Sequence, residues 1–493
     1  MAYVLAIDQS TSATKALLYD AQGRCLDKAS REHRQHYPRP GWVEHDPEEI
    51  WQNVLEVVRE LVTRQGERFG EVVCLSLANQ RETVLVFERR TGRPLYPAIV
   101  WQCRRGSPIC RELEAAGHGS LVTERTGLRL DTYFSAPKLK WLVHDRPDLA
   151  ARLRSGDAVV GTVDAFLIHR LTGGRVFATD PTNACRTLLY DIGRLGWDEE
   201  LCALFEVPPG ALPEVRESRD RFGETTCEGL LPRSVPICGV MGDSQASLFA
   251  QRCYEPGMAK ITLGSGSSVL LNIGRQLRLI SGGSVTTLAW VLEGRPTYCL
   301  EGIINFSAAT IAWLRDQLGL IRDAREAETL AASVPDNGGV YLVPAFAGLS
   351  APYWRPEARA AIVGLTAHAT RQHVVRAAEE SIAYQLRDVL EMMRSESGVP
   401  LRCVRADGGP TRDRFLMQFI ADMLGTEIEV SPVADGSALG AAMAGLLGMG
   451  VYNDLSQLAR LSLETGRFVP QMPAEAVERL VAGWKDAVRR VLT

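Results

Sequence analysis

The feature that most constrains the fold is a strand–polar turn–strand pattern that opens each half of the chain. In the first half, the apolar segment Tyr3–Ile7 leads into the polar turn Asp8–Thr14 and a second strand over Lys15–Tyr19. In the second half, Met258–Leu263 leads into the small-residue turn Gly264–Ser268 and a returning strand. Segments with helical spacing of apolar residues follow in both halves. This alternation predicts an α/β protein with mostly parallel sheets covered by helices, and it suggests a duplicated domain.

The length of the chain agrees with two such domains. At roughly 100–200 residues per domain, a chain of 493 residues holds about two large domains. We expect an N-terminal domain over 1–246 and a C-terminal domain over 247–493. No Pro- or Ser-rich linker marks the boundary.

Composition and charge exclude several classes of protein. The hydrophobic fraction of 46% and the charged fraction of 23% are those of a globular protein, not of a disordered or fibrous one. A net charge of −4 gives no global basic field, so we expect neither nucleic acid nor a membrane surface as a partner.

The cysteines predict a reducing compartment. The two that lie closest in sequence are Cys103 and Cys110, and no C-x-x-C motif occurs. Eleven cysteines without paired spacing are typical of free thiols. The N-terminus lacks a basic segment and its apolar run stops at Asp8, which indicates a first strand and not a signal peptide. We therefore expect a cytoplasmic protein.

Three turns at strand ends carry small or hydroxyl residues: Ser10–Ser12, Gly264–Gly266 and Asp407–Gly409. Glycine allows backbone N–H groups to approach an anion closely, and hydroxyls add further donors. One such turn alone is more often only a turn, but three of them in a two-domain α/β chain could converge on one cleft. The P-loop motif and a G-x-G-x-x-G motif opening a helix are both absent, so any nucleotide is bound by a different architecture.

Aspartates at strand ends add a second signal. Asp8 ends the first strand, and Asp243 follows the apolar run Val235–Gly242. Such residues commonly cap turns, but phosphoryl transfer also needs two carboxylates, one for Mg²⁺ and one to accept the proton of the attacking hydroxyl. Arg81 and Glu82 would then supply a donor beside an acceptor for vicinal hydroxyls.

Several segments together resemble the FGGY carbohydrate kinase family, and within it the glycerol kinases. The resemblance covers nearly the whole chain in order. It implies two actin-like (ribonuclease H-like) ATPase domains with ATP and a sugar or polyol in the cleft between them. The segments that carry it are Asp8–Thr11, Pro40–Pro47, Asn79–Thr83, Val100–Arg105, Tyr133–Leu142, Gly242–Asp243, Ala351–Trp354 and Ala360–Gln385.

The resemblance also implies roles for single residues. Asp243 is the implied catalytic base, and Asp8 is the implied carboxylate for Mg²⁺. The residues implied to bind the polyol are Arg81, Glu82, Trp101, Tyr133 and Asp243. The positions implied to contact the nucleotide are Thr11, Ser12, Lys15, Ser265, Gly266, Gly408, Gly409 and Asp413.

Two positions in the implied polyol pocket depart from the glycerol kinase pattern. Ser244 stands where those enzymes have a glutamine, and Ser268 stands where they place a phenylalanine against the glycerol carbons. Both changes replace a larger side chain with a small hydroxyl-bearing one. We therefore expect a wider and more polar pocket at one end.

The sequence predicts an ATP- and Mg²⁺-dependent kinase that phosphorylates a terminal hydroxyl of a small polyol, with glycerol as the first candidate. The same chemistry on a four- or five-carbon polyol or ketose is the nearest alternative. A non-catalytic actin-like ATPase or sugar sensor is an alternative of another class. The resemblance further implies a homodimer or homotetramer.

Overall fold

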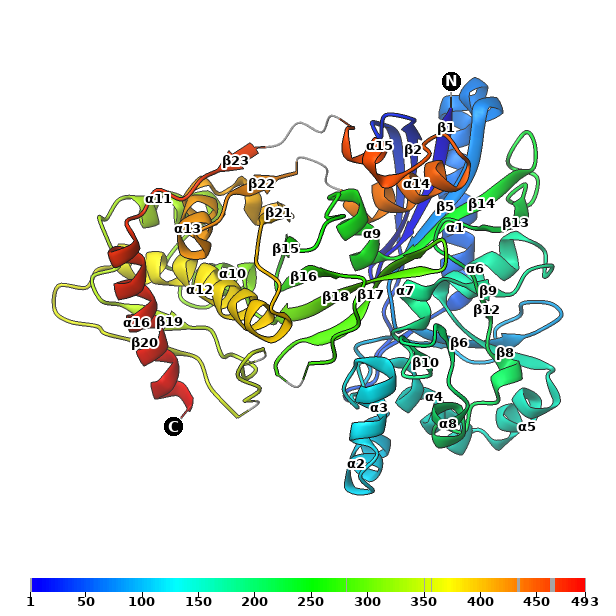
Figure 1. Ribbon diagram of the computed structural model, residues 1–493, viewed down its shortest axis with the longest axis horizontal. Helices are drawn as coiled ribbons and strands as arrows, with labels where there is room; N and C mark the ends of the chain where they lie inside the picture. Colours follow the sequence, from blue (N-terminus) through cyan, green and yellow to red (C-terminus); the bar gives the residue numbers. More distant parts are fainter. Residues whose placement is uncertain are drawn as a thin grey trace.

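The computed structural model describes residues 2–280, 282–349, 351–355, 357–431, 435–461 and 466–492. Two large sheets with helices on their faces organise it (Figure 1). The strands of the first sheet, in spatial order, are β13 (Arg221–Thr225), β14 (Val235–Gly242), β5 (Val72–Asn79), β1 (Tyr3–Gln9), β2 (Ala13–Asp20) and β3 (Cys25–Glu32). Those of the second sheet are β17 (Val285–Leu292), β18 (Arg295–Ile304), β16 (Ser267–Gly274), β15 (Met258–Leu263), β21 (Cys403–Asp407), β22 (Ile428–Val430) and β23 (Gly466–Phe468).

Smaller sheets flank these two. A four-stranded sheet runs in the order β4 (Glu44–His45), β7 (Ala98–Ile99), β6 (Val84–Glu88) and β8 (Ala158–Thr162). Three strand pairs complete the described strands: β9 (Ala178–Thr179) with β12 (Glu214–Val215), β10 (Tyr190–Asp191) with β11 (Gly196–Trp197), and β19 (Tyr341–Val343) with β20 (Ala361–Val363).

The helices fall between the strands, as predicted. Those of the first half are α1 (Pro47–Gln65), α2 (Ser107–Ala115), α3 (Gly119–Thr126), α4 (Ser135–Asp145), α5 (Pro147–Ser155), α6 (Val163–Leu171), α7 (Pro181–Ala184), α8 (Glu199–Leu204) and α9 (Asp243–Ala250). Those of the second half are α10 (Ala308–Asp316), α11 (Ala324–Ala332), α12 (Arg371–Ser397), α13 (Arg414–Leu424), α14 (Gly436–Gly448), α15 (Leu455–Ala459) and α16 (Ala474–Leu492). The predicted α/β fold with two sheet-based domains is confirmed. The prediction of mostly parallel sheets is wrong, because three of the five strand pairings in the first sheet and four of the six in the second are antiparallel. Strands joined by a short turn, such as β1 with β2 and β15 with β16, pair antiparallel.

Helix α14 belongs to the second half in sequence but packs on the first sheet, against β14, β5 and β1 and against α9 (Figure 1). Its glycines permit this close approach. A Cβ at Gly440 would lie 1.8 Å from the carbonyl oxygen of Ala246, and one at Gly445 would lie 2.3 Å from Oγ of Ser76. The C-terminal half is therefore anchored on both sheets. The division of the chain at residues 246 and 247 stays a prediction.

No helix among the described residues combines the length and the apolar character needed to cross a membrane.

Candidate active site

The site begins at the edge of the first sheet where three parallel strands end. β1 pairs in parallel with β5, and β5 pairs in parallel with β14. The register aligns Gln9, Asn79 and Gly242 in one row. Asp8 precedes this row in β1, and Asp243 follows it as the first residue of α9. The carboxyl ends of parallel strands are where open α/β sheets bind ligands, so the two predicted carboxylates lie at the expected edge.

Arg81 and Glu82 leave the same edge through a sharp turn after β5. Glu82 has a φ of 61°, in the left-handed region that non-glycine residues seldom adopt. The turn is fixed by the N–H of Thr83, which donates to the carbonyl of Arg81 at 2.7 Å, and by the hydroxyl of Ser135, which donates to the carbonyl of Glu82 at 3.0 Å. Strained backbone of this kind persists where the surroundings over-determine it, commonly at functional sites.

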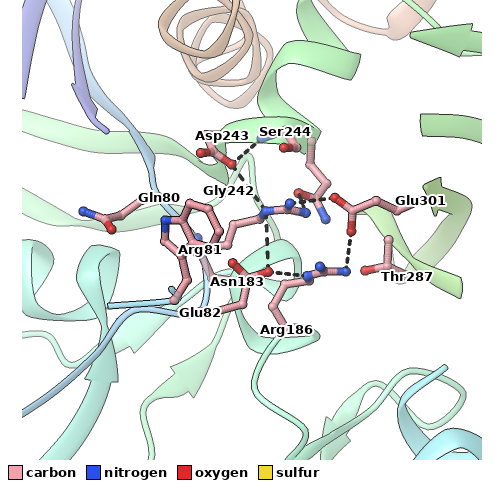
Figure 2. A network of polar contacts seen from close by, with 12 residues as sticks. Gln80, Arg81, Glu82, Asn183, Arg186, Gly242, Asp243, Ser244, Thr287 and Glu301 are labelled. Carbon is pink, nitrogen blue, oxygen red and sulfur yellow. Dashed lines mark hydrogen bonds and ion pairs between the residues drawn. The ribbon is translucent and has the colours of Figure 1, made fainter. Parts of the chain in front are cut away.

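Five charged side chains converge here, and we call them the charged cluster: Arg81, Glu82, Arg186, Asp243 and Glu301 (Figure 2). Nη2 of Arg81 lies 2.6 Å from Oε1 of Glu301. Nε of Arg186 lies 2.6 Å from Oε1 of Glu82, and its Nη1 lies 2.6 Å from Oε2 of Glu301. The cluster therefore joins both halves of the chain through short ion pairs.

Burial and opposite charge set the ionisation of the two glutamates. Burial opposes the charged form of Glu301, but Arg186 and Arg81 outweigh it and hold its pKa at about 2. Burial raises the pKa of Glu82 above its usual value, although Arg81 and Arg186 oppose this. Glu301 is in short contact with two guanidiniums and Glu82 with one, which accounts for the difference.

Asp243 is the least buried member of the charged cluster, with 37% of its side chain exposed. The backbone N–H of Ser244 donates to its Oδ1 at 2.6 Å, and Nε of Arg81 lies 3.3 Å from the same oxygen. None of the hydrogen bonds between described residues uses Oδ2 of Asp243. One oxygen is thus oriented by the protein, and the other is available to a ligand.

Trp101 and Tyr133 lie against each other beside the charged cluster, with ring centroids 5.3 Å apart and ring planes tilted by 59°. The indole N–H of Trp101 donates to the Thr11 hydroxyl at 3.0 Å. Burial, followed by the charge of Glu82, raises the pKa of Tyr133, so its phenol stays protonated. The predicted polyol residues therefore come together, and Trp101 connects them to the turn after β1.

Lys15 lies between two aspartates. Its Nζ is 3.5 Å from Oδ2 of Asp8 and 3.0 Å from Oδ1 of Asp435, which also receives the ammonium of Lys28. Oδ1 of Asp8 is buried and has no hydrogen-bond partner in the described structure. Burial raises the pKa of Asp8 in spite of the opposing charge of Lys15.

The two glycine turns of the second half lie side by side. The residue before the first turn, Leu263, has its carbonyl oxygen 1.9 Å from where a Cβ of Gly408 would be, so only glycine fits there. Gly408 also has a φ of 104°. A Cβ at Gly409 would meet nothing within 4 Å, so this turn faces open space. Asp413 follows it and caps α13, because its Oδ1 accepts the N–H of Leu416 at 2.8 Å.

The remaining predicted residues belong partly to the first half of the chain and partly to the second. Ser12 and Ser265 are exposed on the turns after β1 and β15, and Gly266 carries the chain into β16. Ser244 follows Asp243 in α9. Ser268 pairs with Ile303 in the register that pairs Leu270 with Glu301, so Ser268 and Glu301 share one face of the second sheet. The hydroxyl of Ser268 is buried and has no hydrogen-bond partner in the described structure.

The sequence reasoning missed Arg186 and Glu301. A glutamate inside the apolar run of β18 is an available signal, because a charge in a buried strand needs a partner. Arg186 carries no comparable local signal, since it follows the short helix α7 among polar residues.

Comparisons with known proteins identify the family of the chain. Residues 3–250 match the model of the N-terminal domain of the FGGY family of carbohydrate kinases, and residues 259–449 match the model of its C-terminal domain. The chain is 46% identical over 492 residues to glycerol kinase 1 of Thermotoga maritima, covering 100% of both chains. It is 47% identical over 489 residues to glycerol kinase of Symbiobacterium thermophilum, covering 99% of this chain and 98% of the other.

Solved structures show the same relationship. The crystal structure of Plasmodium falciparum glycerol kinase with ADP superposes with a TM-score of 0.96 at 35% identity, covering 100% of this chain and 99% of that one. A xylulose kinase from Lactobacillus acidophilus shares the fold, with a TM-score of 0.90 at 20% identity over 100% of this chain and 98% of the other. By both of its domains and by its full-length relatives, the chain belongs to the FGGY family of carbohydrate kinases.

Proposed function

We propose that the protein is an ATP-dependent kinase that phosphorylates a terminal hydroxyl of glycerol. The observation that carries this proposal is the arrangement of Arg81, Glu82 and Asp243 around one point. Nε of Arg81 is buried without a hydrogen-bond partner and lies 3.3 Å from Asp243 and 3.8 Å from Glu82. A donor beside two carboxylates suits a molecule with adjacent hydroxyl groups. The names of the full-length relatives support glycerol as that molecule.

In this proposal Asp243 accepts the proton of the hydroxyl that attacks the γ-phosphorus of ATP in line. The Ser244 N–H holds Oδ1 of Asp243, with the Arg81 guanidinium 3.3 Å from the same oxygen, which leaves Oδ2 for the substrate hydroxyl. Arg81 and Glu82 orient the neighbouring hydroxyls, while the rings of Trp101 and Tyr133 cover the carbon chain. Such positioning supplies most of the catalysis in phosphoryl transfer.

The residues of the nucleotide side fit ATP with Mg²⁺. A bound Mg²⁺ would neutralise phosphate charge, and the unpartnered Oδ1 of Asp8 suits one of its water ligands or the ion itself. Proteins commonly bind Mg²⁺ through one or two carboxylates together with substrate phosphates. Lys15 and the turns at Gly264–Gly266 and Gly408–Gly409 would receive the phosphates and the nucleoside.

A four- or five-carbon polyol or ketose is a second candidate substrate. The observation that favours it is the buried, unpartnered hydroxyl of Ser268, on the same face of the second sheet as Glu301. An additional substrate hydroxyl would satisfy it, whereas glycerol has no further group to offer.

We further propose a cytoplasmic location and a homodimer or homotetramer, together with the domain division at 246 and 247. The described cysteines are all free thiols, which supports a reducing compartment.

The test is ADP release coupled to a spectroscopic readout, with ATP and Mg²⁺, in the presence of glycerol, tetritols, pentitols, ketopentoses or no acceptor. Glycerol-dependent ADP release supports the leading proposal. Release that depends only on a longer polyol supports the second candidate, and acceptor-independent release contradicts both.

A further inference from the structure

Glu301 reaches the charged cluster from the opposite sheet. It lies on β18 in the second sheet, whereas Arg81 and Arg186 belong to the first half of the chain (Figure 2). Its two oxygens are divided between the two guanidiniums, at 2.6 Å each. All three side chains are buried, with 1% of Glu301, 5% of Arg81 and 1% of Arg186 exposed.

Two of the three guanidinium nitrogens of Arg81 are held by contacts that lead to the second sheet, one directly and one through Gln245. Nη2 is held by Glu301, and Nη1 donates to Oε1 of Gln245 at 3.1 Å. Gln245 is itself anchored to that sheet, because its Nε2 donates to the carbonyl of Leu288 in β17 at 3.1 Å. A guanidinium is planar and rigid, so fixing both Nη atoms also fixes the direction of Nε.

The direction of Nε decides what Arg81 can do. In the present arrangement Nε lies 3.3 Å from Asp243 without a hydrogen bond to it. Without Glu301, the freed Nη2 could turn toward Asp243 and form a two-pronged pair with its carboxylate. Such a pair would occupy Oδ2 of the base, the oxygen that is otherwise available to the substrate hydroxyl.

We propose that Glu301 is a positioning residue for phosphoryl transfer, which holds Arg81 to the second sheet so that Arg81 forms no two-pronged pair with Asp243 and the base keeps one oxygen free for the polyol. This inference rests on the proposed kinase function. It adds that the pair of Arg81 and Asp243, which lies at the end of the first sheet, is correctly arranged only while the second sheet supplies Glu301.

The competing interpretation is purely structural. Two buried guanidiniums need a carboxylate, and removing one partner of a buried ion pair destabilises a protein wherever the pair lies. A matched control is available in the pair of Arg376 and Glu380 within α12. Nε of Arg376 lies 2.7 Å from Oε1 of Glu380, whose side chain is 0% exposed. This pair makes no contact with the charged cluster.

The experiment compares Glu301→Gln with Glu380→Gln in the full chain, by steady-state kinetics and thermal unfolding. Activity is expressed per folded molecule, from circular dichroism at the assay temperature. We expect Glu301→Gln to lower kcat at least tenfold and to raise KM for glycerol, with KM for ATP within twofold of wild type. Glu380→Gln should lower the unfolding temperature, with kcat within twofold of wild type.

Each outcome decides the inference. A Glu301→Gln variant whose kcat and KM for glycerol stay within twofold of wild type would overturn it, whatever its stability. Glu301→Asp decides the matter if the glutamine variant does not fold. The shorter carboxylate keeps the charge but cannot reach both guanidiniums, so kcat should fall by an intermediate amount, and a wild-type kcat would overturn the inference.

The inference and the proposed function fail in different ways. If wild type turns over a longer polyol in place of glycerol, the same comparison is made with that substrate. If wild type turns over no acceptor, the proposed function is wrong and the inference falls with it. If wild type is active and Glu301→Gln is equally active, only the inference is wrong.

Discussion

Nε of Arg81 lies 3.3 Å from Oδ1 of Asp243. This contact connects the turn after β5 to the first residue of α9, at the edge of the first sheet. The same carboxylate oxygen accepts the N–H of Ser244. Donor, base and helix start are thus mutually oriented before any substrate arrives. This preorganisation underlies the predictions below.

Lys15 is expected to serve the nucleotide and not the polyol. Lys15→Gln should raise KM for ATP about tenfold or more, because a positive charge near the phosphates is lost, while KM for glycerol changes less than threefold. The control is Lys28→Gln. Both ammonium groups contact Asp435, but only that of Lys15 also contacts Asp8. Equal effects of the two substitutions on KM for ATP would show that Lys15 acts only through Asp435.

Ser244 and Ser268 are expected to set substrate size. A buried hydroxyl left without a partner costs about 1–3 kcal/mol, and a longer polyol that satisfies it gains a corresponding part of this in kcat/KM. The double variant Ser244→Gln/Ser268→Phe should lower the ratio of kcat/KM for pentitols to that for glycerol by about 10–100-fold. The single variants serve as controls for each position. An unchanged ratio would mean that neither serine contacts the acceptor.

Asp413 is expected to make stability depend on pH. Burial raises its pKa to about 6, helped by the charge of Glu328 and opposed by the Leu416 N–H. A carboxyl whose folded pKa is raised contributes stability that is present below its unfolded pKa, near pH 4, and is lost as pH rises through about 6. Asp413→Asn keeps the helix cap and cannot ionise. In the ligand-free protein it should therefore gain stability over wild type, by about 1–2 kcal/mol, between pH 4 and 7.

Asp454→Asn is the control with the opposite sign. Asp454 also caps a helix, but hydrogen bonds from Ser456 and from the Gln457 N–H lower its pKa. The advantage of wild type over this variant should shrink as pH falls through the lowered pKa. Parallel stability curves for Asp413→Asn and wild type would contradict the assigned pKa.

Local signals in the sequence predicted much of the fold and placed Asp8, Arg81, Glu82 and Asp243 at the ends of strands. The strands around Asp8 and the turn after β5 each follow from an apolar run that ends in polar residues. Each of these two signals is contained within a few neighbouring positions of the sequence. The ion pair of Arg81 with Glu301 joins residues 220 positions apart, and that of Lys15 with Asp435 joins residues 420 apart. Such pairs depend on how the two halves pack, which no local pattern encodes.

The length of the chain could not predict how the two halves pack on each other. The length of the chain predicted two domains in succession, but α14 returns from the second half to cover the first sheet. The small residues of α14 allow a close approach to the first sheet, but they carry no local signal of which sheet the helix covers.

The most direct test of the account is ADP release by wild type and by Asp243→Asn, with glycerol and without an acceptor. The substitution keeps the shape of the side chain but removes the proton acceptor, and general-base catalysis is worth roughly 10²–10⁴-fold. The account predicts glycerol-dependent turnover by wild type, a loss of that size in kcat for the variant, and unchanged ATP binding by calorimetry. Near-normal turnover by Asp243→Asn, or wild-type turnover that ignores the acceptor, would contradict it.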